Sequence, residues 1–292
     1  MGVGSINKTE LPINTFCTWR RVNYFALGAH KNMQNMNAHQ CLIFAHRGAN
    51  KEAAENTRSA FDKALEYSID GIETDVQLSR DEVAVLWHDR FMGKLGHPSK
   101  HIDDYDYVQL QAMNFAAHFS SSAKPEGIMS LQEFLDAYRK RCRLLLEIKN
   151  REWESASRHQ IKVRQTLDMA RELDDASNGD AIMASSFNLD SLIYAHQYRP
   201  GFPLVYNFET EQTFADAQRV LSEQFFLHGL CLPIASLDEA MVKLLRDHGK
   251  CIAVYTCNSD VEINKALELG VDILISDVPQ KGLMMRSQHQ NR

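Results

Sequence analysis

Residues 71–87, GIETDVQLSRDEVAVLW, hold two apolar segments separated by a short polar turn. Both segments have the composition of strands, so we expect strands at Gly71–Val76 and Val83–Trp87. Only the six residues 77–82 connect them, whereas a crossover between parallel strands needs roughly a dozen or more. The second strand must therefore run back antiparallel to the first, as a hairpin.

Outside this hairpin, short apolar segments alternate with helical patterns. The other expected strands are Cys41–Ala45, Leu144–Ile148, Ala181–Ser185, Leu204–Tyr206, Leu230–Leu232, Cys251–Tyr255 and Ile273–Ser276. Strand–helix alternation is typical of a parallel sheet. With the antiparallel arm set aside, eight strands remain, the number in a (β/α)8 TIM barrel. We predict this α/β fold, with the hairpin after strand two and an inserted subdomain (about residues 90–140) at the barrel top.

Three segments combine a helix-capping box with apolar residues at helical spacing. In such a box a Ser or Thr stands three residues before a Glu or Gln, and each side chain bonds the other residue's backbone N–H. The pattern occurs at Ser130–Glu133, Ser236–Glu239 and Ser259–Glu262, and predicts a helix start at each. Glu55–Thr57 is interpreted mainly as another helix start, with Asn56 as a natural cap.

The composition is that of a globular protein with a mildly acidic charge. The 292 residues include 32 Lys and Arg against 38 Asp and Glu, a net charge of −6, so no nucleic-acid partner is expected. No unbroken apolar run exceeds five residues, whereas a membrane helix needs about 20, so no stable membrane insertion is expected. The six cysteines form no CxxC pair, which favours reduced packing residues in a cytoplasmic protein.

The first 40 residues differ from the rest of the chain. They are rich in asparagine and weakly periodic, and Met33 and Met36 stand just before the first expected strand. We interpret residues 1–40 as an N-terminal extension, either flexible or the product of a misassigned start codon, and residues 41–292 as the barrel. No sequence feature requires a dimer, so the oligomeric state is left open.

Acidic residues stand near the ends of the expected parallel strands, and in a TIM barrel the carboxyl ends of the strands carry the active site. Glu73 and Asp75 are two residues apart and share a face of their strand, as do Glu147 and Lys149. Three carboxylates without a sulfur ligand are the donor set of a hard divalent cation. Glu73, Asp75 and Glu147 therefore predict a site for Mg²⁺ or Ca²⁺.

Two cations and two histidines accompany these carboxylates. A divalent cation together with Arg47 and Lys149 suits a phosphate ester, whose oxygens gain negative charge in the transition state. His46 and His88 belong to the residue type that titrates near neutral pH, so one can accept a proton while the other donates one. We predict catalysis by the two histidines and phosphate binding by Arg47 and Lys149.

Taken in order, the motifs of the chain resemble those of the glycerophosphodiester phosphodiesterase family. The resemblance runs from Ile43 to about Pro279. It is carried by Ala45–Gly48, Glu55–Thr57, Gly71–Val76, His88–Asp89, Leu131–Glu133, Glu147–Lys149, Ser185–Phe187, Tyr255–Asn258 and Gly270–Pro279. It implies a barrel enzyme that hydrolyses small glycerophosphodiesters to sn-glycerol 3-phosphate and an alcohol, with the roles given above for the metal ligands, the histidines, Arg47 and Lys149.

The chain departs from the family pattern at a few positions. After His88-Asp89 the family usually continues toward an Arg-Thr-Thr segment, where this chain has Arg90-Phe-Met-Gly-Lys-Leu-Gly96. Position 255 is Tyr where many members have Trp. These departures leave the preferred alcohol open. Two other functions stay open as alternatives: a phospholipid phosphodiesterase or lyase of the same barrel type, and a non-catalytic barrel that binds a ligand.

Overall fold

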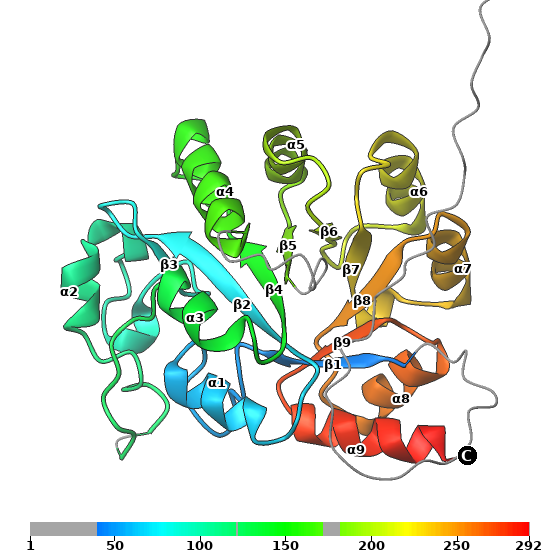
Figure 1. Cartoon of the computed structure of the whole chain (residues 1–292), viewed down its shortest axis with the longest axis horizontal. Coiled ribbons are helices and arrows are strands. Elements are labelled where there is room, and N and C mark those ends of the chain that lie inside the picture. The colour runs from blue at the N-terminus through cyan, green and yellow to red at the C-terminus, as the bar shows by residue number, and fades with distance from the viewer. Residues whose placement is uncertain (1–39, 121, 172–181, 292) are drawn as a thin grey trace, which may run out of the picture.

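The computed structural model describes residues 40–120, 122–171 and 182–291. In this part of the chain, eight parallel strands close into a barrel (Figure 1). They are β1 (Leu42–His46), β2 (Gly71–Leu78), β4 (Arg143–Ile148), β5 (Ile182–Ser186), β6 (Leu204–Asn207), β7 (Gly229–Pro233), β8 (Cys251–Tyr255) and β9 (Ile273–Ser276). Because β1 pairs with both β2 and β9, the ring is complete and the predicted (β/α)8 TIM barrel is confirmed. Ala181 and residues 1–39 lie outside the described residues.

The hairpin predicted after the second strand is also confirmed. β3 (Ala84–Leu86) pairs antiparallel with the end of β2, with Val76 opposite Leu86. The turn closes through a hydrogen bond from the Ser79 N–H to the Val83 carbonyl (3.0 Å). Beyond β3, the Trp87 N–H donates to the Asp75 carbonyl (3.1 Å), so the chain returns to the mouth of the barrel where His88 follows.

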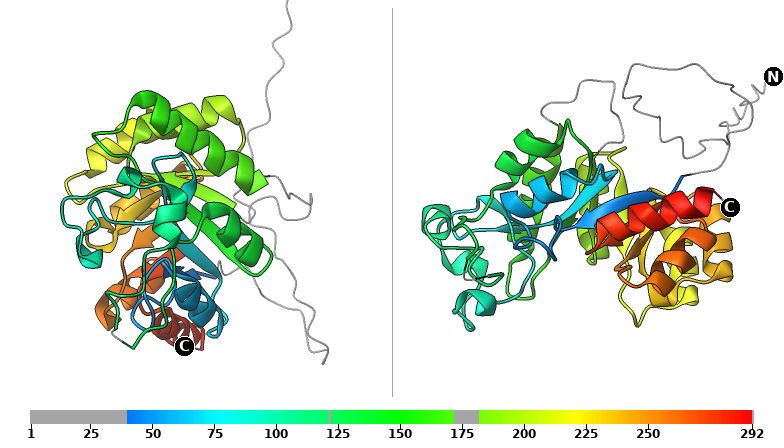
Figure 2. Two further views of the ribbon diagram at one scale, coloured as in Figure 1. Left: turned by 90° about the vertical axis from the view of Figure 1, so that its left-hand side faces the viewer. Right: turned by 90° about the horizontal axis from the view of Figure 1, so that it is seen from below.

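Helices cover the outside of the barrel between the strands (Figures 1 and 2). They are α1 (Arg58–Leu65), α3 (Leu131–Tyr138), α4 (Ala156–Arg171), α5 (Leu189–Tyr198), α6 (Phe214–Glu223), α7 (Glu239–Asp247), α8 (Asp260–Glu268) and α9 (Pro279–Gln290). Their apolar faces pack on the strands and form two large clusters of buried side chains.

The helix starts follow the predicted caps at two of three positions. Ser130 and Ser259 form capping boxes with Glu133 and Glu262. The box predicted at Ser236 is wrong: Ser236 ends a 3-10 helix (Ile234–Ser236), and Asp238 caps α7 by accepting a hydrogen bond from the Met241 N–H. The intervening Leu237 is buried and extended (φ −86°, ψ 129°), so α7 cannot begin before Asp238.

The barrel interior is filled below the mouth by apolar side chains. They are Phe44, Leu145, Met183, Val205, Cys231, Cys251, Ala253, Ile273 and Ile275. Side chains two residues apart share a face of a strand. Glu147 on β4 and Lys149, the residue directly after β4, therefore follow Leu145 on the interior face. On β2, Gly71 meets the Phe44 ring, so Glu73 and Asp75 follow it on the interior face as well.

The chain between β3 and α3 forms a small substructure with its own core. It contains two 3-10 helices, η1 (Gly93–Leu95) and η2 (Ile102–Asp104), and the short helix α2 (Tyr107–Gln111). Its buried side chains are Val85, Trp87, Met92, Ile102, Leu110, Phe115 and Ile128. The helix α3, by contrast, packs into the cluster that lies against the barrel strands.

No helix among the described residues is both long and apolar enough to cross a membrane.

Candidate active site

The three predicted acidic residues meet at the carboxyl end of the barrel. Asp75 of β2 lies beside Glu147 of β4 in the parallel register, and Glu73 precedes Asp75 on the same face. Glu73, Asp75 and Glu147 are all buried, and one carboxylate oxygen from each lies within 4.8 Å of the others. Three buried carboxylates at such separations repel one another unless cations compensate them.

The donor set fits a hard divalent cation. Among the described residues, the buried oxygen Glu73 Oε2 accepts no hydrogen bond, whereas Asp75 Oδ1 and Glu147 Oε1 are paired with the Lys149 ammonium. Unsatisfied buried carboxylate oxygens carry a high desolvation cost, which a cation with oxygen ligands offsets. The three predicted metal ligands therefore lie together as a set of buried oxygen donors.

Two side-chain cations lie against the same carboxylates. Lys149 Nζ is 2.9 Å from Asp75 Oδ1 and 2.5 Å from Glu147 Oε1. Arg47 Nε is 3.0 Å from Asp75 Oδ2, and its terminal nitrogen is 3.3 Å from Glu55 Oε2. In this arrangement Arg47 and Lys149 partly neutralise the acidic cluster.

The charges divide unequally between the two acids of β2. Burial would raise the pKa of Asp75, but Arg47 and Lys149 together hold it well below its usual range. Burial raises the pKa of Glu73 well above its usual range, and the nearby charges of Asp75 and Glu147 add to the effect. Glu73 is therefore the carboxylate that most needs a further positive charge.

His46 is fixed by a carboxylate from the opposite end of the barrel sequence. Its Nδ1 lies 2.6 Å from Asp277 Oδ1, and its Nε2 faces Glu73 Oε2 at 3.8 Å. Asp277 also accepts hydrogen bonds from Asn50 Nδ2 (2.6 Å) and Asn258 Nδ2 (2.9 Å). These contacts outweigh burial and keep the pKa of Asp277 below its usual range. An ionised carboxylate only accepts, so His46 Nδ1 carries the proton and Nε2 faces the site.

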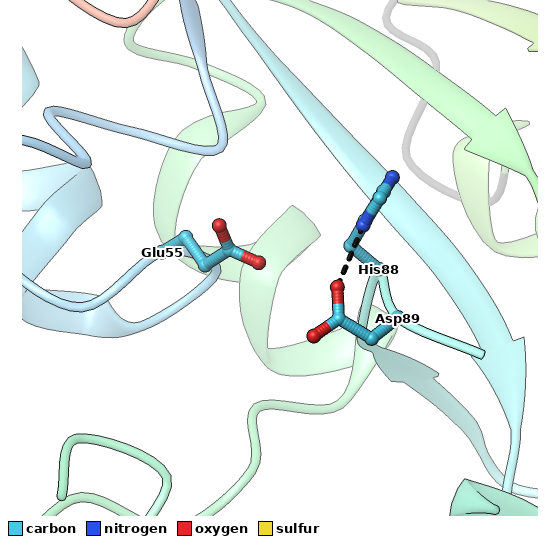
Figure 3. Close-up of side chains that lie close together, drawn as sticks. All are labelled: Glu55, His88 and Asp89. Atoms are coloured by element: carbon cyan, nitrogen blue, oxygen red, sulfur yellow. Dashed lines mark hydrogen bonds and ion pairs between the residues drawn. The ribbon is translucent and has the colours of Figure 1, made fainter. Parts of the chain in front are cut away.

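His88 has a similar arrangement on the hairpin side. Its Nδ1 lies 2.9 Å from Asp89 Oδ1 (Figure 3). Burial raises the pKa of Asp89, but the bonds from His88 and Lys94 outweigh it and lower the pKa to about 2. Asp89 is therefore ionised at neutral pH and accepts from His88 Nδ1. In both predicted catalytic histidines, Nδ1 is thus hydrogen-bonded to an aspartate, and Nε2 is the ring nitrogen that this bond does not use.

Burial is the main influence on the pKa of His46. It lowers the pKa of His46 below its usual value, against the hydrogen bond to Asp277 that raises it. The side chain of His88 is more exposed, at 35% against 17% for His46. The two histidines therefore differ in how far their rings are shielded from water.

Sequence reasoning missed part of this site. Asn56 is not the helix cap, because Thr57 caps α1. Asn56 instead adopts a left-handed backbone (φ 57°), donates to Asp75 Oδ2 (2.9 Å) and accepts from the Thr74 hydroxyl (2.8 Å). Asn is the residue type that tolerates this conformation, so the side chain fixes the orientation of a predicted metal ligand. Glu55, interpreted mainly as a helix-start residue, lies at the site edge against Arg47.

A model of the glycerophosphoryl diester phosphodiesterase family matches residues 46–281. The match covers most of the chain and spans the residues from His46 to Asp277 described above. Among curated relatives, a glycerophosphodiester phosphodiesterase of Bacillus subtilis is 24% identical over 247 residues, 82% of this chain and 84% of that protein. A glycerophosphodiester phosphodiesterase of Bacillus altitudinis is 26% identical over 250 residues, 84% of this chain and 98% of that protein.

Solved structures of similar proteins share the fold. A phosphodiesterase from Oleispira antarctica, in complex with the product sn-glycerol-3-phosphate, has a TM-score of 0.74 and 23% identity, over 86% of this chain and 97% of that one. A protein from Silicibacter pomeroyi, described as a putative glycerophosphoryl diester phosphodiesterase, also has a TM-score of 0.74, with 20% identity, over 86% of this chain and 94% of that one.

Proposed function

Because the chain belongs to the glycerophosphoryl diester phosphodiesterase family, we propose that it hydrolyses glycerophosphodiesters to sn-glycerol 3-phosphate and an alcohol. The observation that carries this proposal is the convergence of two histidines, three carboxylates and two cations at the mouth of the barrel. Hydrolysis of a phosphodiester requires charge neutralisation at phosphorus and a proton transfer on each side of it. Each of these requirements has a candidate group here.

Glu73, Asp75 and Glu147 would hold the divalent cation. When bound, such a cation polarises the phosphoryl oxygens and neutralises the charge that develops on them. Magnesium and calcium both accept three carboxylates in this way, so the physiological ion is a separate question. Once a cation compensates the carboxylates, Arg47 and Lys149 have charge available for the phosphate oxygens, and Arg47 offers the planar fork that matches them.

The histidines move the protons. One histidine takes a proton at Nε2 from the attacking oxygen, which forms a new bond to phosphorus. The other donates a proton from Nε2 to the alcohol oxygen as its bond to phosphorus breaks. The attacking oxygen is either water or the 2-hydroxyl of the glycerol, and the second route passes through a cyclic phosphate that water then opens. The donor begins the step as an imidazolium and the acceptor ends it as one, and Asp277 and Asp89 would stabilise this charged form of His46 and His88 respectively.

The proposal is tested with glycerophosphocholine and phosphorus NMR on the full chain. We expect the diester signal to be replaced by that of sn-glycerol 3-phosphate, with free choline released. His46→Ala and His88→Ala should each lower kcat by about 10²–10⁴-fold, the usual contribution of a general acid or base. A cyclic phosphate that accumulates as the final product would favour the lyase alternative. Unchanged substrate with every glycerophosphodiester tried would contradict the proposal.

A further inference from the structure

A second cluster of possible metal ligands lies beside the site. Glu55, His88 and Asp89 offer ligand atoms that all lie within 4.8 Å of one another (Figure 3). Two carboxylates and an imidazole are a donor set that borderline divalent ions accept readily. A cation bound there through His88 would fix its ring and remove it from proton transfer.

A lysine of the inserted substructure already occupies this cluster. Lys94 Nζ lies 2.6 Å from Glu55 Oε1 and 2.9 Å from Asp89 Oδ2. It also lies 4.6 Å from the centre of the buried Trp87 ring, as in a cation–π contact. The side chain is only 21% exposed. The ammonium therefore contacts both carboxylates of the cluster and an aromatic face.

The backbone around Lys94 holds it in this position. Lys94 is the central residue of η1. Met92, which is fully buried, precedes this 3-10 helix, and Gly96 follows it. Met92 forms an isolated bridge with His97, and its N–H donates to the Lys100 carbonyl (2.8 Å). Gly96 ends the turn at φ 86°, a conformation that favours glycine. The short loop is thus anchored on both sides of the lysine.

Lys94 also completes an alternating series of charges across the site. The series runs from Asp75 through Arg47, Glu55 and Lys94 to Asp89. Each positive group lies between two negative ones. Asp89 is therefore already paired with the Lys94 ammonium while its other oxygen contacts His88 Nδ1. Removal of the lysine would leave Glu55 with Arg47 as its paired cation and Asp89 without the Lys94 ammonium, and the lost compensation costs free energy unless another cation enters.

We infer that Lys94 is a positioning residue that acts as a built-in cation: it occupies the Glu55–His88–Asp89 cluster, keeps divalent ions out of it and leaves His88 free to transfer protons. The role toward His88 rests on the proposed function, whereas the exclusion of the cation does not.

The test counts bound cations. The full chain is stripped with chelator and titrated calorimetrically with Mn²⁺, and the Lys94→Met variant is titrated in parallel. We expect the variant to bind one more Mn²⁺ per chain than the wild type. Lys94→Arg, which keeps the charge, should bind the same number as the wild type. Lys100→Met, which removes an exposed lysine of the same substructure, should also leave the number unchanged.

Two further measurements separate the explanations. Lys94→Met/Glu55→Gln removes one ligand of the cluster and should return the stoichiometry to that of the wild type. In the assay, excess Mn²⁺ should inhibit Lys94→Met at concentrations that the wild type tolerates, and dilution should reverse the inhibition. Equal stoichiometry in the wild type and in Lys94→Met would overturn the inference. If Lys94→Met does not fold, Lys94→Gln replaces it with the same expected outcome. Because stoichiometry is measured without substrate, it stands even if the proposed hydrolysis fails.

Discussion

At the scale of single residues, each candidate histidine acts together with a carboxylate. His46 and His88 both direct Nδ1 at an aspartate that other donors keep ionised. A carboxylate in this position fixes the tautomer and orients the ring, so that the outer nitrogen faces the substrate. The carboxylate partners should therefore affect turnover although they do not contact the reacting atoms.

Asp277→Asn should lower kcat by about 10²-fold or more, toward the range of 10²–10⁴ that a general acid or base contributes. The amide can donate to Nδ1, which would place the ring proton on the wrong nitrogen. KM for glycerophosphocholine should change little, because Asp277 lies behind His46. Steady-state kinetics separate the two constants. A variant that keeps its melting temperature and shows wild-type kcat would contradict the tautomer argument.

Glu73→Gln should weaken cation binding and stabilise the cation-free protein. In the folded chain without a cation, burial raises the pKa of Glu73, so the folded state binds more protons than the unfolded state above the ordinary glutamate pKa. Stability contributed by protonated Glu73 is therefore lost as pH rises through the raised pKa. Glutamine removes this loss. Between pH 5 and pH 8 in the presence of chelator, the melting temperature should fall less steeply with pH in the variant than in the wild type.

An equal or steeper fall in the variant would show that Glu73 is not protonated in the cation-free state. Asn56→Ala is the control, because it removes a hydrogen bond to Asp75 without changing the number of carboxylates. Its melting temperature should fall with pH as steeply as that of the wild type.

The residues that meet at the candidate site could be located from the sequence, but the contacts that support them could not. His46, His88, the three acids, Arg47 and Lys149 stand next to apolar strand segments, and that local signal identified them. The partners are distant in sequence: Asp277 is 231 positions from His46, and Lys94 is 39 from Glu55. Nothing in the local pattern of a loop indicates which carboxylate its lysine will meet.

At the scale of elements, connection length and strand pattern were sufficient for the barrel. The six-residue link after the second strand excluded a parallel crossover, and β3 is indeed antiparallel. The predicted start of α7 was wrong because Ser236 and Asp238 both offer a capping oxygen, and the burial of Leu237 decides between them. Ser and Asp have similar preferences for the cap position, so the local sequence does not choose between Ser236 and Asp238. The burial of Leu237 favours Asp238 as the cap.

Close packing between neighbouring strands gives a prediction at this scale. A Cβ at Gly229, the first residue of β7, would lie 2.2 Å from the Cys251 carbonyl oxygen of β8. Backbone atoms must shift to admit it, so Gly229→Ala should lower the free energy of unfolding by roughly 1–3 kcal/mol. Urea denaturation measures the change.

Gly93→Ala is the matched control for that experiment. A Cβ there would meet only Pro98 at 3.7 Å or more. Its effect should stay within about 0.5 kcal/mol, as for other unstrained surface sites. Equal effects at the two glycines would contradict the packing argument.

At the scale of the whole molecule, the barrel and the inserted substructure each supply part of the candidate site. Closure of eight parallel strands brings Glu73, Glu147 and Asp277 to one rim. The hairpin and the substructure behind it supply His88, Asp89 and Lys94 from above that rim. The site is therefore complete only when both parts are folded, and we propose that a divalent cation held by the three carboxylates is required for its activity.

The most direct test of this account is the cation dependence of glycerol 3-phosphate release. Chelator-treated protein is incubated with glycerophosphocholine, and the product is coupled to a dehydrogenase assay before and after Mg²⁺ or Ca²⁺ is restored. We expect negligible release without a cation, recovery when the cation is restored, and no recovery in Glu73→Gln at the same cation concentration. Full activity in the chelated wild type, or no activity in the cation-loaded folded protein, would contradict it.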